Sequence, residues 1–371
     1  MKLDAVELRR IRLPLVSPFR TSFGTQTERD VLLVRAVTPE AEGWGECVAM
    51  EEPLYNEEYV DGAQQVIAEH LLPRVMKRAD LRPDDVATAL APVKGNRMAK
   101  AAIEAAVLDA ALKAAGLSMG RYLGASRDAV DCGVSVGIMD SVDALLGAVQ
   151  GYVDQGYRRI KLKIEPGADI DRVRAVRQLI GPDFPLQVDA NTAYTLDDAD
   201  HLAELDEFNL LLIEQPLPEE LLLANAKLAA VVKTPICLDE SILSAEVAAE
   251  AIDMGACSII NIKAGRVGGY LEGKRIHDLC LDRGVPVWCG GMLETGIGRA
   301  ANVALAALPG FTLPGDTSAS DRYFSEDITT PFVLEDGRLR VPTEPGIGVE
   351  VRRDAIDRMT TSTRTMTASE V

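Results

Sequence analysis

The 371-residue sequence is poor in the residues that mark several common kinds of site. It has only three histidines, and each falls inside a helical pattern, away from the ends of predicted strands. Its six cysteines lie mostly within apolar segments and lack metal-ligand spacing. The start of the chain has neither the charged region nor the apolar core of a signal peptide. We therefore expect free buried thiols in a cytoplasmic protein.

Positive charge and long apolar runs are also scarce. The formal net charge is −18, and no basic run interrupts it. Because phosphate backbones are bound by clustered Lys and Arg, this balance argues against nucleic acid as a partner. No stretch approaches the roughly 20 apolar residues that a membrane span requires. We expect neither nucleic acid nor membrane binding.

What the sequence does contain is a ladder of charges in its second half. Five short apolar runs each end in an ionisable residue, at intervals of 24 to 26 residues. These residues are Lys163, Asp189, Glu214, Asp239 and Lys263. The runs are rich in leucine and β-branched residues, as expected of strands that are buried on both faces. Since the carboxyl ends of parallel barrel strands converge on one mouth, the ladder predicts a single active site.

The interval of about 25 residues fits one strand, one helix and two loops, which is the repeat of a parallel barrel. Helical patterns lie between the charges, for example over residues 169–180 before Gly181. Extending the period predicts further strands at 132–137, 285–288 and 311–313, which gives eight between about 130 and 315. The predicted fold class is α/β, with a modified (β/α)8 barrel of the (β/α)7β kind.

The length of the chain suits a barrel plus a second domain. Residues 1–125 lack the repeat, alternate in polarity at first and then turn helical, so we expect an α+β capping domain that carries substrate-specificity loops. Residues 126–325 form the predicted barrel with the catalytic residues. We expect residues 326–358 to pack back on the capping domain, and the Thr/Ser-rich residues 359–371 to be a disordered tail.

Three carboxylates at consecutive strand ends need a cation. Each of Asp189, Glu214 and Asp239 could simply cap the helix that follows its strand. Together at one mouth they would repel one another unless a positive charge neutralised them. Carboxylate oxygens with room for water and substrate suit Mg²⁺, for which Mn²⁺ or another divalent cation can substitute. The pattern predicts a metal site made of these three residues.

The lysines are candidates for proton transfer. Lys161 and Lys163 are two residues apart on one strand, so both should point into the barrel. Neighbouring ammonium groups and a dication would lower their pKa values towards those of a general base, and Lys263 should experience the same field. The predicted site has a metal in the middle and a potential base on each side.

This pattern resembles the enolase superfamily, and within it the muconate-lactonising branch, whose mark is Lys-x-Lys, then Asp, Glu, Asp and Lys on successive strands. The resemblance extends over nearly the full length to the N-succinylamino acid racemase and o-succinylbenzoate synthase group. It rests on residues 18–24, 43–47, 133–137, 160–167, 188–192 and 313–317. The seventh predicted strand end has no histidine, which argues against the mandelate racemase branch. Residues 316–318, Asp-Thr-Ser, lack the Asp-x-Asp of dipeptide epimerases.

The resemblance implies roles for particular residues. Lys163 and Lys263 would be catalytic, Lys161 would bind substrate, and Arg266 is similar to an arginine associated with racemase activity. Residues of the capping domain would close the pocket, and residues of the barrel would line it. By this analogy the substrate-binding residues are Lys161, Arg266, Phe19, Phe23, Met50, Ser135, Asn191, Gly291, Met292, Leu293, Asp316 and Tyr323.

The resemblance further implies a divalent-metal-dependent enzyme that removes a proton α to a carboxylate and forms an ene-diolate. The expected activity is racemisation of N-acylamino acids, N-succinylamino acids in particular, together with o-succinylbenzoate synthesis. The latter, a dehydration in menaquinone synthesis, is an alternative main role, and dipeptide epimerase or cycloisomerase activity is a weaker one. We expect a small carboxylate substrate and a homo-oligomer.

Two readings of other classes remain open at this stage. A barrel aldolase could use Lys263 as a Schiff-base nucleophile, although this leaves the three carboxylates unexplained. Borohydride trapping with a carbonyl substrate would distinguish it from a chelator-sensitive enzyme. A metal-dependent binding or scaffold protein could retain the barrel without its chemistry, and deuterium exchange into a candidate substrate would test for that.

Overall fold

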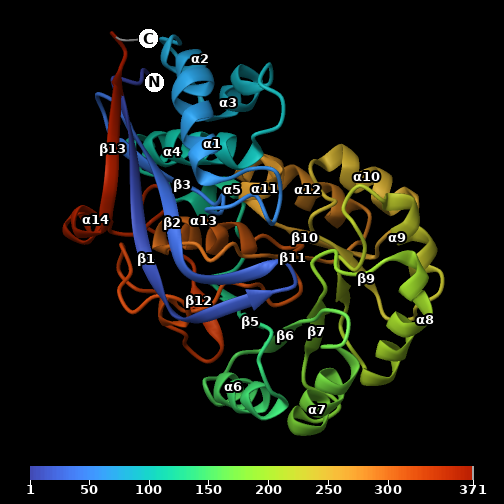
Figure 1. The fold of residues 1–371 in the computed structure, drawn as a ribbon. Helices are drawn as coiled ribbons and strands as arrows, with labels where there is room; N and C mark the ends of the chain where they lie inside the picture. The colour runs from blue at the N-terminus through green and yellow to red at the C-terminus, as the bar shows by residue number, and fades with distance from the viewer. Residues whose placement is uncertain (370–371) are drawn as a thin grey trace.

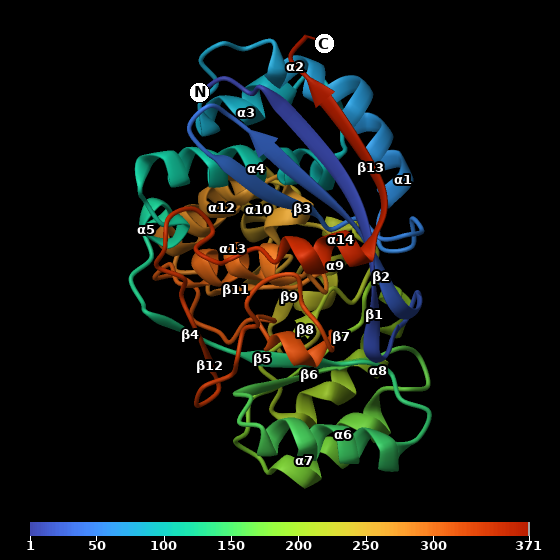
Figure 2. The same ribbon diagram turned by 90° about the vertical axis from the view of Figure 1, so that its left-hand side faces the viewer.

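The chain forms an antiparallel sheet with helices at one end and a curled parallel sheet ringed by helices at the other (Figure 1). This computed structural model describes residues 1–369. Among those residues, no helix is both long enough and apolar enough to cross a membrane. The two regions lie against each other, and the described end of the chain returns to the antiparallel sheet (Figure 2).

The parallel sheet has seven strands in sequential order, so each strand lies beside the next one along the chain. The strands are β5 (Gly133–Val136), β6 (Arg159–Lys163), β7 (Leu186–Asp189), β8 (Ile213–Glu214), β9 (Ile236–Leu238), β10 (Ile259–Ile262) and β11 (Val287–Cys289). Two isolated parallel bridges, Val287 to Phe311 and Cys132 to Gly315, occupy the eighth position and connect β11 to the start of β5. The predicted barrel fold is confirmed, but a full eighth strand over residues 311–313 is wrong.

Helices follow most of these strands and cover the outside of the sheet. The major ones are α6 (Val142–Asp154), α7 (Ile170–Ile180), α9 (Leu222–Ala229), α10 (Ala245–Asp253), α12 (Tyr270–Asp282) and α13 (Gly296–Ala306). Shorter turns are η2 (Leu196–Asp198), α8 (Ala199–Leu202), η3 (Ala203–Phe208) and α11 (Ala264–Val267). Helix α7 illustrates the local signals: Asp169 accepts a hydrogen bond from the Ile170 N–H at its start, Val173 and Val176 are buried, and Gly181 ends it at φ +82°.

The N-terminal domain packs helices on one face of the antiparallel sheet. Its strands are β1 (Ala5–Thr21), β2 (Gly24–Val37) and β3 (Glu42–Cys47). Its helices are α1 (Val60–Val66), η1 (Ile67–Leu71), α2 (Leu72–Met76), α3 (Pro83–Leu90), α4 (Arg97–Ala115) and α5 (Met119–Leu123). Helix α4 lies so close to β3 that a Cβ on Gly45 would be 2.1 Å from the Ala102 carbonyl oxygen. Glycine is therefore required there for close packing.

The hairpin formed by β1 and β2 extends beyond this domain to the barrel (Figure 2). Near its tip, the Ile138 N–H donates to the Arg20 carbonyl oxygen at 2.8 Å. The Ser22 hydroxyl donates to the Ala190 carbonyl oxygen at 3.2 Å. These contacts hold the hairpin tip beside the carboxyl ends of β5 and β7.

The C-terminal region agrees in part with the prediction that residues 326–358 pack back on the capping domain. Strand β12 (Arg338–Arg340) pairs with β4 (Ala129–Asp131), which directly precedes the first barrel strand, so these residues do not pack on the capping domain. The residues that follow do pack there, because the Met119 N–H donates to the Gly346 carbonyl oxygen at 2.7 Å and the Ile347 N–H donates to Asp109 Oδ1 at 2.8 Å. Helix α14 (Arg353–Met359) does contact that domain, through an ion pair of Arg353 with Glu42.

The predicted disordered tail is also wrong over most of its length. Strand β13 (Thr360–Thr367) pairs antiparallel with β1 and forms the edge of the sheet. The physical reason is that Thr recurs along this segment, and β-branched residues favour an extended edge strand even when exposed. Residues 370 and 371 of the predicted tail lie outside the described residues.

Candidate active site

The charged ladder occupies one end of the parallel sheet. Lys163, Asp189 and Glu214 are the last residues of β6, β7 and β8 and are paired in register. Asp239 directly follows β9, and Lys263 directly follows β10. The three carboxylate residues are fully buried, and Lys263 is 5% exposed. The other end of the barrel is filled by an apolar cluster that includes Trp288, which is also fully buried, so the mouth is the accessible end.

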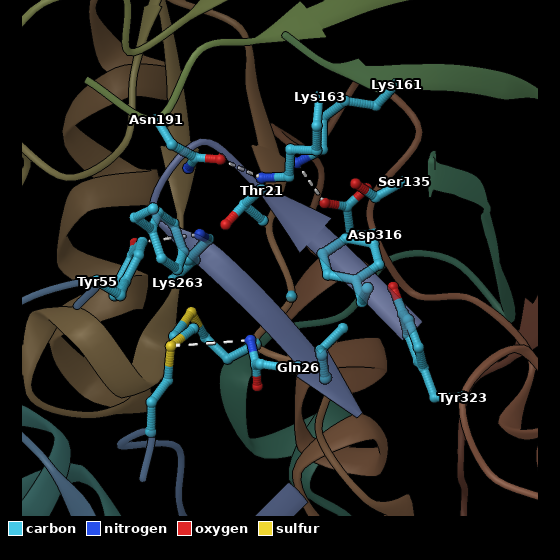
Figure 3. Close-up of a pocket in the computed structure, with 16 residues that line it drawn as sticks. Thr21, Gln26, Tyr55, Ser135, Lys161, Lys163, Asn191, Lys263, Asp316 and Tyr323 are labelled. Carbon is cyan, nitrogen blue, oxygen red and sulfur yellow. Dashed lines mark hydrogen bonds and ion pairs between the residues drawn. The ribbon is translucent and has the colours of Figure 1, made fainter. Parts of the chain in front are cut away.

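A cavity opens at this mouth (Figure 3). Both predicted catalytic lysines and all but one of the predicted substrate-binding residues line it, and the exception is Arg266. The residues at the wall are Phe19, Phe23, Met50, Ser135, Lys161, Lys163, Asn191, Lys263, Gly291, Met292, Leu293, Asp316 and Tyr323. The Ser135 hydroxyl is buried and has no hydrogen-bond partner among the described residues, so it is free to contact a ligand.

Three further residues line the cavity and were not predicted: Thr21, Gln26 and Tyr55. Thr21 lies between Phe19 and Phe23 at a spacing of two along the hairpin, so the period of a strand could have indicated it. Gln26 pairs in register with Phe19 across the hairpin. Tyr55 lies in the segment between β3 and α1, and no local signal in the sequence indicates that it reaches the barrel.

The donor set at the centre fits a divalent cation in kind. The pKa of Glu214 is raised to about 8, mainly by burial and then by the negative charges of Asp189 and Asp239. Carboxylates that are close together and shielded from water raise one another's pKa in this way. Asp239 Oδ1 is buried and accepts no hydrogen bond from the described residues. Hard cations bind oxygen donors of this type. Asp189, Glu214 and Asp239 could therefore hold such an ion.

In this conformation lysines lie against those oxygens. Within residues 1–369, no three acidic, His or Cys side chains already surround one ion-sized position. Lys163 Nζ donates to Asp189 Oδ2 at 2.5 Å, and Lys263 Nζ donates to Asp239 Oδ2 at 2.6 Å. Burial opposes ionisation of Asp189, but the nearby lysines outweigh it and hold its pKa well below the usual range.

Lys161 is the most deeply enclosed of the three lysines. Its Nζ lies 2.7 Å from Asp316 Oδ2 and 3.1 Å from Glu214 Oε2, and it lies 4.8 Å from the centre of the Trp288 ring. Burial would lower its pKa, but the carboxylates of Asp316, Glu214 and Asp189 outweigh burial and raise it. Lys161 thus carries a fixed positive charge suited to binding an anionic group.

Lys163 and Lys263 enter the cavity from different sides (Figure 3). Their strands, β6 and β10, are separated by three strands in the sheet, which places the two side chains across the mouth from each other. Burial would lower the pKa of Lys263, but Asp239 and other neighbouring groups outweigh it and raise the pKa well above its ordinary value. The prediction that the pKa values of Lys161 and Lys263 are lowered is therefore wrong for the protein alone, because the neighbouring carboxylates raise both.

Arg266 lies behind the cavity wall, in contrast to its predicted contact with substrate. Its Nε is 3.1 Å from Asp239 Oδ1, an ion-pair distance without hydrogen-bond alignment, and its Nη2 donates to the Asn261 carbonyl oxygen at 3.1 Å. Its Nη1 donates to the Ile242 carbonyl oxygen. The reason is geometric: Arg266 lies inside the short helix α11, on the turn after Lys263, and points back into the protein. It touches Asp239, which in turn holds Lys263.

Aromatic side chains from the capping domain cover the cavity. The ring of Phe19 packs edge-on against Tyr323 with centres 6.2 Å apart, and Phe23 packs against Tyr55 with centres 6.0 Å apart. Phe19 is only 7% exposed. The hairpin tip thus forms an apolar cover over a polar floor, an arrangement that excludes water from the charged groups.

Comparisons with known proteins agree with this architecture. Residues 5–124 match the mandelate racemase / muconate lactonizing enzyme N-terminal domain, and residues 144–355 match the enolase C-terminal domain-like family. An N-succinylamino acid racemase from Amycolatopsis sp. is 62% identical over 98% of both chains. An o-succinylbenzoate synthase from Geobacillus kaustophilus is 49% identical over 97% of this chain and 96% of its own.

A solved structure gives the same result. The crystal structure of an enolase superfamily member from Listeria innocua covers 99% of this chain and 100% of its own, with a TM-score of 0.95 and 42% identity. A two-domain fold with a charged barrel mouth and a capping domain defines an enolase-type enzyme. The chain belongs to the mandelate racemase and muconate lactonizing enzyme family of the enolase superfamily.

Proposed function

We propose that the protein is a racemase of N-acylamino acids, N-succinylamino acids in particular, that also catalyses o-succinylbenzoate synthesis. The observation that carries the proposal is the position of Lys163 and Lys263 on opposite sides of one covered cavity. Inversion of an α-carbon needs one group to take the proton and another to return it from the other side. Two of the similar proteins bear these two activities as their names.

In the proposed mechanism each residue has a separate task. Lys163 removes the α-proton of one enantiomer, and Lys263 delivers a proton to the opposite face. The reverse direction exchanges their roles. Lys161 provides a permanent positive charge at the barrel floor, and Ser135 offers an uncommitted hydroxyl. The apolar cover formed by Phe19 and Phe23 keeps water away while the carbon carries charge.

A metal completes the site in this proposal. Asp189, Glu214 and Asp239 would hold Mg²⁺, or Mn²⁺ or another divalent cation in its place. When bound, such an ion offsets the negative charge that develops on a substrate carboxylate as the α-proton leaves. Charge neutralisation of this kind accounts for three buried acids at consecutive strand ends.

The same residues support o-succinylbenzoate synthesis, which remains the alternative main role. There Lys163 would take the proton and then assist departure of hydroxide from the same side. Lys263 would only need to stay charged and stabilise the intermediate. Dipeptide epimerisation and cycloisomerisation are weaker alternatives for this site. The homo-oligomeric state and cytoplasmic location expected from the sequence remain predictions.

The proposed function is tested with separate enantiomers of a panel of N-succinylamino acids. Purified enzyme with Mg²⁺ should convert either enantiomer to the racemate, as followed by polarimetry. The same enzyme should lose this activity in excess chelator and regain it when Mg²⁺ is restored. Absence of turnover with every N-succinylamino acid, alongside efficient o-succinylbenzoate formation, would make the dehydration the main activity.

A further inference from the structure

A side chain from the capping domain holds one of the two lysines. Tyr55 is 7% exposed and lies between β3 and α1, far in sequence from the barrel strands. Its hydroxyl oxygen is 3.1 Å from Lys263 Nζ and 3.2 Å from Asp239 Oδ2. Lys263 Nζ also lies 4.7 Å from the centre of the Tyr55 ring (Figure 3). The tyrosine thus contacts the lysine with both its hydroxyl and its ring.

The direction of these hydrogen bonds follows from the groups involved. A lysine ammonium only donates, so the Tyr55 oxygen accepts from Lys263. An ionised carboxylate only accepts, so the single hydroxyl hydrogen of Tyr55 is directed at Asp239 Oδ2. Lys263 donates to that same carboxylate oxygen at 2.6 Å. The three groups form a closed triangle in which the hydroxyl has one orientation.

Among residues 1–369, Lys163 donates no hydrogen bond to the capping domain. Its Nζ donates to Asp189 Oδ2 at 2.5 Å and to Asn191 Oδ1 at 2.7 Å. Both partners belong to β7 or to the loop that follows it, within the barrel. The two lysines therefore depend on different regions of the chain for their orientation.

We infer that Tyr55 is a positioning residue for Lys263, so that the capping domain sets the geometry of one face of proton transfer and leaves the other to the barrel. This inference rests on the proposed function, because it assigns the two faces to the two lysines. The step needs accurate placement, since proton transfer requires the nitrogen within hydrogen-bond reach of the α-hydrogen. Tyr55 also forms part of the wall between this cavity and a second, acidic one, so its ring must be kept in any test.

The test removes only the hydroxyl, in backgrounds where a single lysine remains. Tyr55→Phe is introduced into the Lys163→Ala and Lys263→Ala variants, and α-hydrogen exchange of each N-succinylamino acid enantiomer is followed by NMR in D₂O with Mg²⁺. With only Lys263 present, Tyr55→Phe should slow exchange about tenfold, the effect of one lost hydrogen bond. With only Lys163 present, exchange should stay within about twofold.

A matched control is Tyr59→Phe, which removes a tyrosine hydroxyl from the exposed end of the same segment. It should leave exchange unchanged in both backgrounds. Equal slowing by Tyr55→Phe in both backgrounds would show a general structural effect and overturn the inference. So would the absence of slowing in the background that retains Lys263.

A crystal structure of Tyr55→Phe separates this inference from the proposed function. Lys263 Nζ should move away from its wild-type position while Lys163 Nζ stays in place. An unmoved Lys263 would overturn the positioning role. If no variant and no wild-type enzyme exchanged the α-hydrogens of N-succinylamino acids, the proposed substrate class would fail, and the Lys263 position alone would decide the role of Tyr55.

Discussion

Lys163 and Lys263 face the same cavity but are held by different regions of the molecule. Lys163 is the last residue of a strand, and its partners are a carboxylate and an amide of the barrel. Lys263 follows a strand, and its partners are a barrel carboxylate and the capping-domain residue Tyr55. Two lysines with equivalent roles in proton transfer are therefore positioned by different parts of the chain, one by the barrel alone and one by the barrel together with the capping domain.

Because the two lysines have different hydrogen-bond partners, substitutions can distinguish the two proposed reactions. Racemisation uses both lysines as proton carriers, so it depends on the barrel side and on the capping-domain side. In dehydration only Lys163 transfers a proton, and Lys263 only needs to remain positively charged. A change confined to the Lys263 side should therefore affect racemisation more strongly, and a change at the shared centre should affect both reactions.

The largest effect is expected at the shared centre. Glu214→Gln removes one charge from the proposed ion site, and we expect racemisation and dehydration to fall at least about 10³-fold, because charge stabilisation in the transition state is lost. Steady-state kinetics with and without added Mg²⁺ measures this. The exposed Glu250→Gln on α10 is a matched control and should leave both activities unchanged. Unequal loss of the two activities would show that Glu214 does not serve a common centre.

A change behind Lys263 should divide the two reactions. Burial raises the pKa of Asp239, but Lys263 and Arg266 outweigh it and lower the pKa, so Arg266 helps to keep this carboxylate charged against Lys263. Arg266→Gln should reduce racemisation about 10²-fold and dehydration by less than about tenfold. Parallel assays of both reactions measure the ratio. Arg266→Lys, which keeps the charge, should recover part of the racemisation, and equal losses in both reactions would reduce Arg266 to a structural residue.

A smaller effect is expected at the cover. Phe19→Ala and Phe23→Ala each remove apolar surface over the cavity, so KM should rise about tenfold while kcat changes less. The two substitutions affect different parts of the cavity. Phe23 packs against Tyr55, which contacts Lys263, whereas Phe19 packs against Tyr323. Phe23→Ala should therefore slow exchange on the Lys263 side more than Phe19→Ala does. An unchanged preference across a panel of acyl groups would show that the hairpin does not shape specificity.

A different kind of effect, on stability and not on activity, is expected where the capping domain meets the barrel. Glu104 on α4 accepts a hydrogen bond from the Leu271 N–H of α12 at 3.1 Å. Burial raises the pKa of Glu104 from 4.5 to about 7 despite that bond. Because the pKa is higher in the folded state, this group stabilises the fold fully below pH 4.5, and the contribution is lost as the pH rises through about 7.

The corresponding change in unfolding free energy is at most about 3 kcal/mol. Glu104→Gln should flatten this part of the pH dependence between pH 5 and 7.5, as followed by thermal unfolding. Some dependence should remain, because burial also raises the pKa of Glu46 to about 7. A pH profile identical to that of the wild type would show that the pKa of Glu104 is the same in the folded and the unfolded states.

The candidate site was predictable because strand ends in a parallel barrel converge, so spacing along the sequence becomes proximity in space. The same local rules gave α7 its start at Asp169 and its end at Gly181, and placed a capping box at Thr195 and Asp198. These features depend on neighbours within a few residues, or on a repeat that the sequence displays directly.

What sequence patterns did not predict depends on distant contacts. Tyr55 reaches Lys263 only because two domains meet, and no periodicity encodes that meeting. The direction of Arg266 follows from the turn of α11 after its strand. Residues 360–367 have the composition of a tail, yet the open edge of β1 offers backbone hydrogen-bond partners that order them. The pKa values of Lys161 and Lys263 also followed the attraction of the neighbouring carboxylates rather than the repulsion between lysines.

Deuterium labelling by the two single-lysine variants tests the two-sided mechanism most directly. Each enantiomer of an N-succinylamino acid is incubated in D₂O with Mg²⁺ and either Lys163→Ala or Lys263→Ala. We expect each variant to label the α-carbon of only one enantiomer, the opposite one in each case, and neither variant to racemise either. Labelling of the same enantiomer by both variants, or racemisation by either one, would contradict the assignment of one lysine to each face.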